Sequence, residues 1–157
     1  MKKLILLSVI TLLLISCNRQ KGKIELALSN EIQNCNTPDC KIELKKVTDF
    51  EWDKVYFFEM PITKEYVNKN IGIDYSDYVE FTRPIIFLNK GKIIYSENNE
   101  ASVESLVDEQ IVIGDIIDTT KVRVFTPKEA IFKSAVKEND NLKYYELTPA
   151  PRRVLNK

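Results

Sequence analysis

The sequence contains no histidine and only four glycines among its 157 residues. Without histidine, the chain lacks the commonest general base near neutral pH and the commonest zinc ligand, and a Ser-His-Asp triad is excluded. A glycine-rich phosphate loop and a G-x-S-x-G nucleophile motif are also absent. We therefore expect a protein that is not an enzyme and that uses no cofactor.

An excess of charge of one sign is lacking as well. Lys and Arg together number 23, Asp and Glu together number 23, and the formal net charge is zero. The two signs are interspersed along the chain, as on a solvated surface. Nucleic-acid-binding domains usually carry a basic face or a high pI. We therefore expect no nucleic-acid partner.

The longest apolar run, residues 4–15, is too short for a transmembrane helix, which needs about 20 apolar residues. The run follows the basic start Met1-Lys2-Lys3 and ends at the small residue Ser16. A basic start, a short apolar run and a small residue before the cut are the parts of a secretory signal. The pattern predicts that residues 1–16 are a signal peptide.

Leu14-Ile15-Ser16-Cys17 resembles the lipobox of bacterial lipoproteins. The resemblance implies that the thiol of Cys17 carries a diacylglycerol, that cleavage precedes Cys17, and that the new amine receives a further acyl chain such as palmitate. A diacylated cysteine is sufficient for a stable membrane anchor. Asn18 stands where Asp would resemble an inner-membrane retention signal, which favours the periplasmic face of the outer membrane if the cell has two membranes. The alternative is an ordinary secretory signal with a chance cysteine.

Two cysteines remain, Cys35 and Cys40, separated by the turn-forming residues 36–39. Outside the cytosol such a pair usually forms a disulfide bond. Redox and metal sites more often show a C-x-x-C spacing. We predict a structural disulfide, with free thiols and a redox or metal role as the alternatives.

The mature chain has the size of one ordinary domain. We predict a lipidated tether at 17–23, a single domain at 24–147 and a flexible tail at 148–157. The mixture of patterns predicts an α+β fold, with a small antiparallel sheet and two or three helices packed on one side of it. The expected strands are 42–47, 54–59, 83–88, 92–95, 122–125 and 142–147, and the expected helices are 24–33, 63–71, 101–109 and one that begins at Pro127, while 111–117 is ambiguous between strand and buried loop.

Two helix starts have clear local signals. Thr63 has the spacing of an N-cap residue, and Gly72 suits the end of that helix. Thr126 and Glu129 have the spacing of a capping box, with Pro127 at the first helical position. The second signal is the stronger one and predicts a helix across Val136.

The segment from Phe50 to Tyr56 resembles an F-x-W-D-K-V-Y segment of small exported bacterial proteins of uncharacterised function. The resemblance implies a shared fold and no activity. Trp52 is a candidate for an exposed anchor that binds a partner, because tryptophan is enriched in binding hot spots. The alternative is that Trp52 packs in the core.

Residues 74–78, which we predict to form a loop, combine acids with aromatic residues, and loops carry function more often than cores do. We predict that this loop faces a partner; the alternative is a solvated connection whose tyrosines fold onto the sheet. A second acidic pair, Asp115 and Asp118, is too sparse for a calcium loop, and we expect no metal site. The candidate residues of the loop are Asp74, Tyr75, Asp77 and Tyr78.

These observations predict a membrane-anchored exported lipoprotein of the cell envelope. We expect it to be a non-catalytic binding module, a class that includes inhibitor and immunity proteins, with an envelope protein as its partner. The alternatives are a structural component of the envelope and a hydrolase that uses carboxylates alone.

Overall fold

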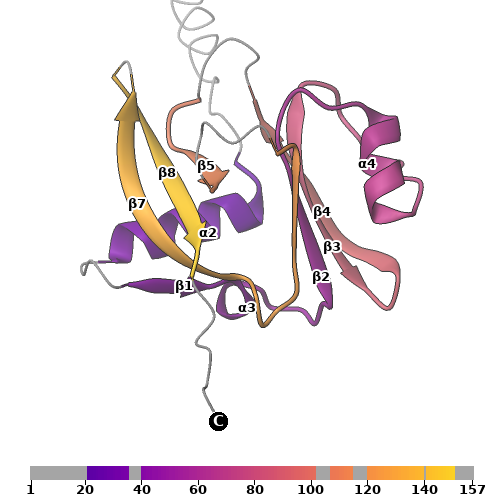
Figure 1. The fold of residues 1–157 in the computed structure, drawn as a ribbon, viewed down its shortest axis with the longest axis horizontal. Coiled ribbons are helices and arrows are strands. Elements are labelled where there is room, and N and C mark those ends of the chain that lie inside the picture. Colours follow the sequence, from indigo (N-terminus) through magenta and orange to yellow (C-terminus); the bar gives the residue numbers. More distant parts are fainter. Residues whose placement is uncertain (1–20, 36–39, 102–106, 115–119, 140, 151–157) are drawn as a thin grey trace, which may run out of the picture.

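The structure is a computed structural model that describes residues 21–35, 40–101, 107–114, 120–139 and 141–150. Two four-stranded sheets, with the strand orders β1-β7-β8-β5 and β4-β3-β2-β6, form most of it (Figure 1). All strand pairs are antiparallel except β5 with β8. The strands are β1 (Lys41–Glu43), β2 (Lys54–Phe58), β3 (Thr82–Asn89), β4 (Lys92–Glu100), β5 (Gln110–Ile113), β6 (Val122–Phe125), β7 (Ile131–Asn139) and β8 (Leu142–Pro149), and the helices are α2 (Lys23–Asn34), α3 (Leu44–Val47) and α4 (Lys64–Ile71).

The fold is therefore richer in β-structure than the predicted α+β fold with one small sheet, and its helices do not share one side, because α2 and α4 pack on opposite faces of the β4-β3-β2-β6 sheet. The main core contains side chains from both sheets and from α2. Helix α2 contributes a stripe of apolar residues spaced by four, which places them on one helical face. This stripe agrees with the predicted helix at 24–33 and consists of Ile24, Leu28 and Ile32.

A second apolar cluster lies on the opposite face of the β4-β3-β2-β6 sheet, which α4 covers (Figure 1). Strand residues Tyr56, Phe58 and Ile86 pack there against Val67 and Ile71 of α4. Because both of its faces are covered, the sheet has central strands that are buried on both sides. This explains why β2 and β3 are nearly continuous apolar runs rather than alternating ones.

The local signals around α4 are confirmed. The hydroxyl of Thr63 accepts a hydrogen bond from the backbone N–H of Tyr66 at 3.3 Å. Gly72 ends the helix with a φ of 74°, which glycine adopts without a steric penalty. The predicted strands 83–88 and 92–95 are also present, and they pair as the antiparallel hairpin of β3 and β4.

Two predicted elements are wrong. The expected strand 42–47 gives way after Glu43 to the short helix α3. No helix follows Thr126: the side chain of Glu129 accepts hydrogen bonds from the backbone N–H and the hydroxyl of Thr126, at 3.1 and 2.9 Å, but the chain continues as β7. Strand β7 pairs with β1 on one side and β8 on the other. These long-range pairings outweigh a local helix signal whose contribution is small.

The chain ends differ from the prediction as well. Lys21 and Gly22, expected in the tether, are hydrogen-bonded to the domain, and α2 already begins at Lys23. Thr148 and Pro149, expected in the tail, belong to β8. The first residues of the segment 111–117, which was ambiguous between strand and buried loop, belong to strand β5. The signal peptide 1–16, Cys17, Asp115, Asp118, most of the expected helix 101–109 and the tail from 151 lie outside the described residues.

The sulfur atoms of Cys35 and Cys40 lie at disulfide-bonding distance, and their Cα atoms are 5.7 Å apart. The spacing of these Cα atoms is normal for a disulfide bond. Within the described ranges, none of the helices is long and apolar enough to span a membrane.

Candidate functional site

The predicted acidic-aromatic loop lies between α4 and β3, and we call residues 73–81 the contact loop. Its first half is fixed by Asn68 on α4, whose amide donates to Asp74 Oδ1 at 2.8 Å and whose amide oxygen accepts from the Tyr75 N–H at 2.9 Å. The Lys64 ammonium lies 3.2 Å from the same Asp74 oxygen. Hydrogen bonding by Lys64 lowers the pKa of Asp74, so this side chain is a carboxylate at neutral pH.

Three further hydrogen bonds fix the second half of the contact loop. The Tyr78 hydroxyl donates to the Ile62 carbonyl at 2.9 Å, and the Asn98 amide on β4 donates to the Asp77 carbonyl at 2.8 Å. The Thr82 hydroxyl donates to the Val79 carbonyl at 2.6 Å. The loop is therefore held in one conformation by groups before it, after it and across from it.

This fixed loop exposes two large apolar side chains, which we call the apolar tip. Val79 is 51% exposed and Phe81 is 65% exposed. Phe81 also has a φ of 59°, in the left-handed region that bulky side chains rarely adopt. A conformation of this kind costs on the order of 1–3 kcal/mol and persists only where the surroundings enforce it. The apolar tip is the clearest departure from ordinary surface structure in the described part of the chain.

The structure divides the predicted partner-binding residues into exposed and buried ones. Asp74 and Asp77 are exposed, and Tyr78 is half-buried beside its hydrogen bond to Ile62. Tyr75, however, is only 1% exposed and packs in the second apolar cluster. Its proposed role as a partner-facing side chain is therefore wrong, because its ring anchors the loop from beneath.

Trp52 is likewise a core residue and not an exposed anchor. It is 5% exposed, its ring makes an edge contact with Phe87 at 5.3 Å between centroids, and its Nε1 donates to the Thr48 hydroxyl at 3.0 Å. The alternative in which Trp52 packs in the core is confirmed. Sequence reasoning missed Val79 and Phe81, although two large apolar residues in an otherwise polar loop were a usable signal.

The described acids of the candidate hydrolase do not converge. Asp53 accepts from the backbone N–H of Lys90 at 2.7 Å, at the hairpin turn of β3 and β4. Asp77 lies at the other end of that hairpin, where Asn98 holds it. Among the residues that the structure describes, no group of three or more acids and cysteines is placed to hold a metal ion.

The N-terminal end of the described chain is clamped to the domain close to the contact loop. The Lys21 ammonium lies 2.8 Å from Glu109 Oε2, and the Gly22 N–H donates to Asn99 Oδ1 at 2.9 Å. Glu97 then accepts the first N–H groups of α2, those of Ile24 at 2.8 Å and Glu25 at 3.0 Å. A carboxylate of β4 therefore caps α2, in place of a cap side chain of its own.

A buried ion pair continues this clamp into the core. Arg83 Nη2 donates to Glu25 Oε1 at 2.8 Å, and both side chains are buried. Arg83 Nη1 also donates to the carbonyl of Ile111 on β5 at 2.8 Å. The pair thus connects α2 and both sheets directly behind the residues that hold Gly22.

Glu59 provides a pH-dependent prediction beside this pair. Burial raises the pKa of Glu59 above its usual 4.5, although Arg83 opposes the shift. Because the folded state then holds the proton more tightly than the unfolded state, ionisation of Glu59 penalises folding as the pH rises above about 4.5. We expect Glu59→Gln to raise the melting temperature at neutral pH, with a gain that shrinks toward pH 4. A gain that grows on acidification would contradict this assignment.

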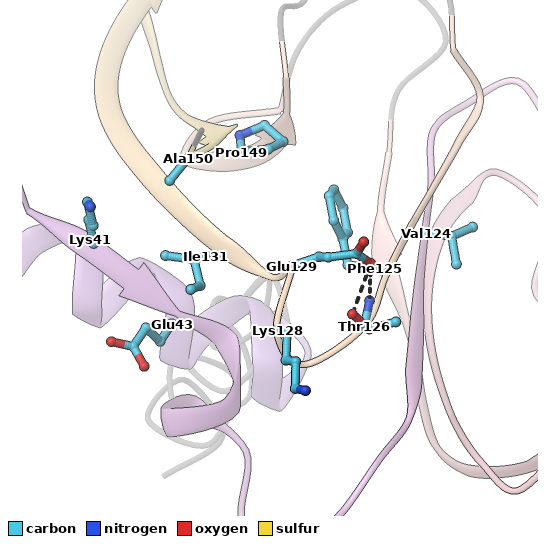
Figure 2. A pocket seen from close by; sticks show the side chains of 10 residues that line it. All are labelled: Lys41, Glu43, Val124, Phe125, Thr126, Lys128, Glu129, Ile131, Pro149 and Ala150. Carbon is cyan, nitrogen blue, oxygen red and sulfur yellow. Dashed lines mark hydrogen bonds between the residues drawn. The ribbon is translucent and has the colours of Figure 1, made fainter. Parts of the chain in front are cut away.

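A hollow of about 890 Å³ lies between the edge strands β1 and β6 and the end of β8 (Figure 2). Lys41 and Glu43 line it from β1, and Val124 from β6. Figure 2 shows the Glu129 carboxylate turned toward Thr126 by its two hydrogen bonds. The described lining residues carry both signs of charge without converging on one point, which gives no basis for assigning a ligand.

The apolar tip and the clamp at Lys21 and Gly22 are the two surface features that we consider further. Side chains from several elements hold the contact loop and the clamp, and both lie at the same end of the β3–β4 hairpin. Comparison of the chain with protein-family models, with curated proteins and with solved structures finds no match.

Proposed function

We propose that this protein is a lipid-anchored, non-catalytic interaction module of the cell envelope. In this proposal, acyl chains on Cys17 hold the mature protein to a membrane, and the apolar tip contacts its partner. The single observation that supports a partner contact by the apolar tip is the position of Phe81 in a loop held by hydrogen bonds. Its side chain is 65% exposed and its φ is 59°.

Both properties of Phe81 are unfavourable for the isolated molecule. Exposure of an aromatic ring forgoes the gain from burial, about 1.5–3 kcal/mol for a large apolar side chain. The left-handed backbone adds a further cost. Aromatic side chains are enriched in the cores of binding interfaces, and a loop that is already ordered loses little entropy on binding. A contact surface is the role that best accounts for this arrangement.

The alternatives receive less support from the described residues. A carboxylate-dependent hydrolase needs two acids in one cleft, with one pKa raised by burial. Asp53 and Asp77 lie at opposite ends of the β3–β4 hairpin, and Asp74 is an exposed carboxylate with a lowered pKa. The alternative of a structural envelope component does not by itself account for an exposed aromatic side chain in the left-handed region. Inhibitor and immunity proteins remain within the proposed class.

A photo-crosslinking amino acid at position 81, introduced in the native cell, tests the contact. We expect it to form a defined adduct, because the side chain projects from a fixed loop. The matched control is position 94, since Ile94 is also an exposed apolar residue but lies near the hairpin turn at the other end of β4. Equal labelling from both positions, or none from position 81, would contradict the proposed contact.

Phe81→Asn separates contact from folding. Asparagine tolerates the left-handed region, and this relief of strain offsets the loss of the roughly one third of the Phe81 surface that is buried. We therefore expect the free energy of unfolding to stay within about 0.5 kcal/mol of the wild-type value, or to rise. A crosslinker at position 79 should meanwhile lose most of its adduct in this background. An unchanged adduct would show that Phe81 makes no contribution to the contact.

A further inference from the structure

The clamp leaves very little chain between the domain and the expected lipid. Lys21 is fixed by Glu109 and Gly22 by Asn99. Only residues 18–20 separate Lys21 from Cys17. Four extended Cα-to-Cα steps span at most about 14 Å. If Cys17 is acylated, as the proposed function holds, the domain is therefore kept against the membrane surface.

The apolar tip lies at the same end of the sheet as this short connection. Asn99, which holds Gly22, is directly opposite Arg83 in the antiparallel register of β3 and β4. Phe81 precedes Arg83 by two residues, a distance of roughly 7 Å along an extended chain. In Figure 1, β3 begins and β4 ends at this end of the sheet, opposite the hairpin turn.

From these two placements, we infer that the partner of the apolar tip is the lipid bilayer itself. In this arrangement Val79 and Phe81 enter the interfacial region beside the acylated cysteine, and the domain rests on the membrane at two points. The inference depends on the lipid anchor of the proposed function. A lipid interface accepts a convex apolar tip without a complementary pocket, and aromatic and aliphatic side chains partition into it favourably.

The charges beside the tip indicate which lipids it fits. Asp77 precedes the tip by two residues and Glu80 lies between Val79 and Phe81, and both acids are exposed. Carboxylates are repelled by the negative surface potential of anionic lipids over about one Debye length. The tip therefore suits a zwitterionic surface, and its insertion should weaken when anionic lipid is added at low salt.

Quenching by brominated acyl chains tests the inference on the full-length, acylated protein in zwitterionic vesicles. A tryptophan introduced by Phe81→Trp should be quenched and blue-shifted, whereas one introduced by Ile94→Trp at the other end of the hairpin should not. Trp52 is present in both variants and is buried, so the fluorescence of the wild-type protein gives the background signal to subtract. Phe81→Asn should speed transfer of the acylated protein between vesicles roughly tenfold, as expected for loss of one buried aromatic side chain.

The outcomes distinguish the inference from the proposed function. Equal quenching of the two introduced tryptophans, or no quenching at position 81, overturns the bilayer as partner. If the crosslinker at position 81 then labels a protein, the interaction module stands with a protein partner. If it labels neither protein nor lipid, both proposals fail. Stronger quenching on anionic vesicles would contradict the argument from Asp77 and Glu80.

Discussion

Replacement of Arg83 by methionine should lower the free energy of unfolding by about 3–5 kcal/mol, because it leaves a buried carboxylate without its partner. Arg83 and Glu25 are both buried, and the ion pair between them measures 2.8 Å. The Ile111 carbonyl would lose a donor at the same time. Chemical denaturation followed by circular dichroism measures this loss.

The matched control removes both charges. In Arg83→Met combined with Glu25→Leu, neither member of the ion pair is left buried without the other, and apolar replacements of buried ion pairs are often close to neutral. We expect the double variant to recover most of the stability that the single variant loses. A double variant as unstable as Arg83→Met would show that packing of the arginine, and not its charge, is what matters.

Replacement of Glu97 by alanine should have a comparable effect, about 3 kcal/mol or more, because several buried donors lose their acceptor together. Besides the N–H groups of Ile24 and Glu25, the Glu97 carboxylate accepts from the Tyr95 hydroxyl at 2.8 Å and from the Asn99 amide at 2.9 Å. Burial and the neighbouring Glu97 both raise the pKa of Tyr95, so its hydroxyl remains a donor at neutral pH.

Hydrogen exchange shows whether the loss of stability in Glu97→Ala begins at the start of α2, which Glu97 caps. In Glu97→Ala, the first turn of α2 and the clamp at Gly22 should lose protection before the β7–β8 pair does. Glu31→Ala is the control, since Glu31 is an exposed residue of the same helix and should change stability by less than about 0.5 kcal/mol. Uniform loss of protection across the domain would contradict a local role for Glu97.

The elements that sequence reasoning predicted correctly are those whose causes are local. Helix α4 is determined by Thr63 at its start and Gly72 at its end, both within the segment itself. The β3–β4 hairpin needs only two apolar runs and a glycine that adopts a positive φ at position 91. The stripe of α2 follows from spacing along twelve residues. Each of these can be read from a short window of sequence.

The errors arise where distant residues decide the structure. Glu129 accepts from the backbone N–H of Thr126, which is one of the two contacts of a capping box, yet β7 forms because strands on both sides pair with it. The partners of Arg83 and Glu97 in α2 are 58 and 73 residues away along the chain. A short sequence window contains no trace of such pairings.

The candidate site shows the same division. Sequence reasoning located the loop and its acids, because turn and aromatic residues gather there. It assigned contact to Tyr75, which anchors the loop, and overlooked Phe81, which projects from it. Which aromatic side chains of the contact loop are buried depends on how the loop is held against α4 and β4. Asn68 of α4 and Asn98 of β4 hold it by hydrogen bonds.

We propose above all that the domain is attached to a membrane through Cys17, a few residues before its clamp. Mass spectrometry of the N-terminal peptide, from protein isolated from the native cell, measures this directly. The account predicts a peptide that begins at Cys17 and carries two or three acyl chains. A peptide that begins at Cys17 without lipid, or one that still contains residues 1–16, would contradict it.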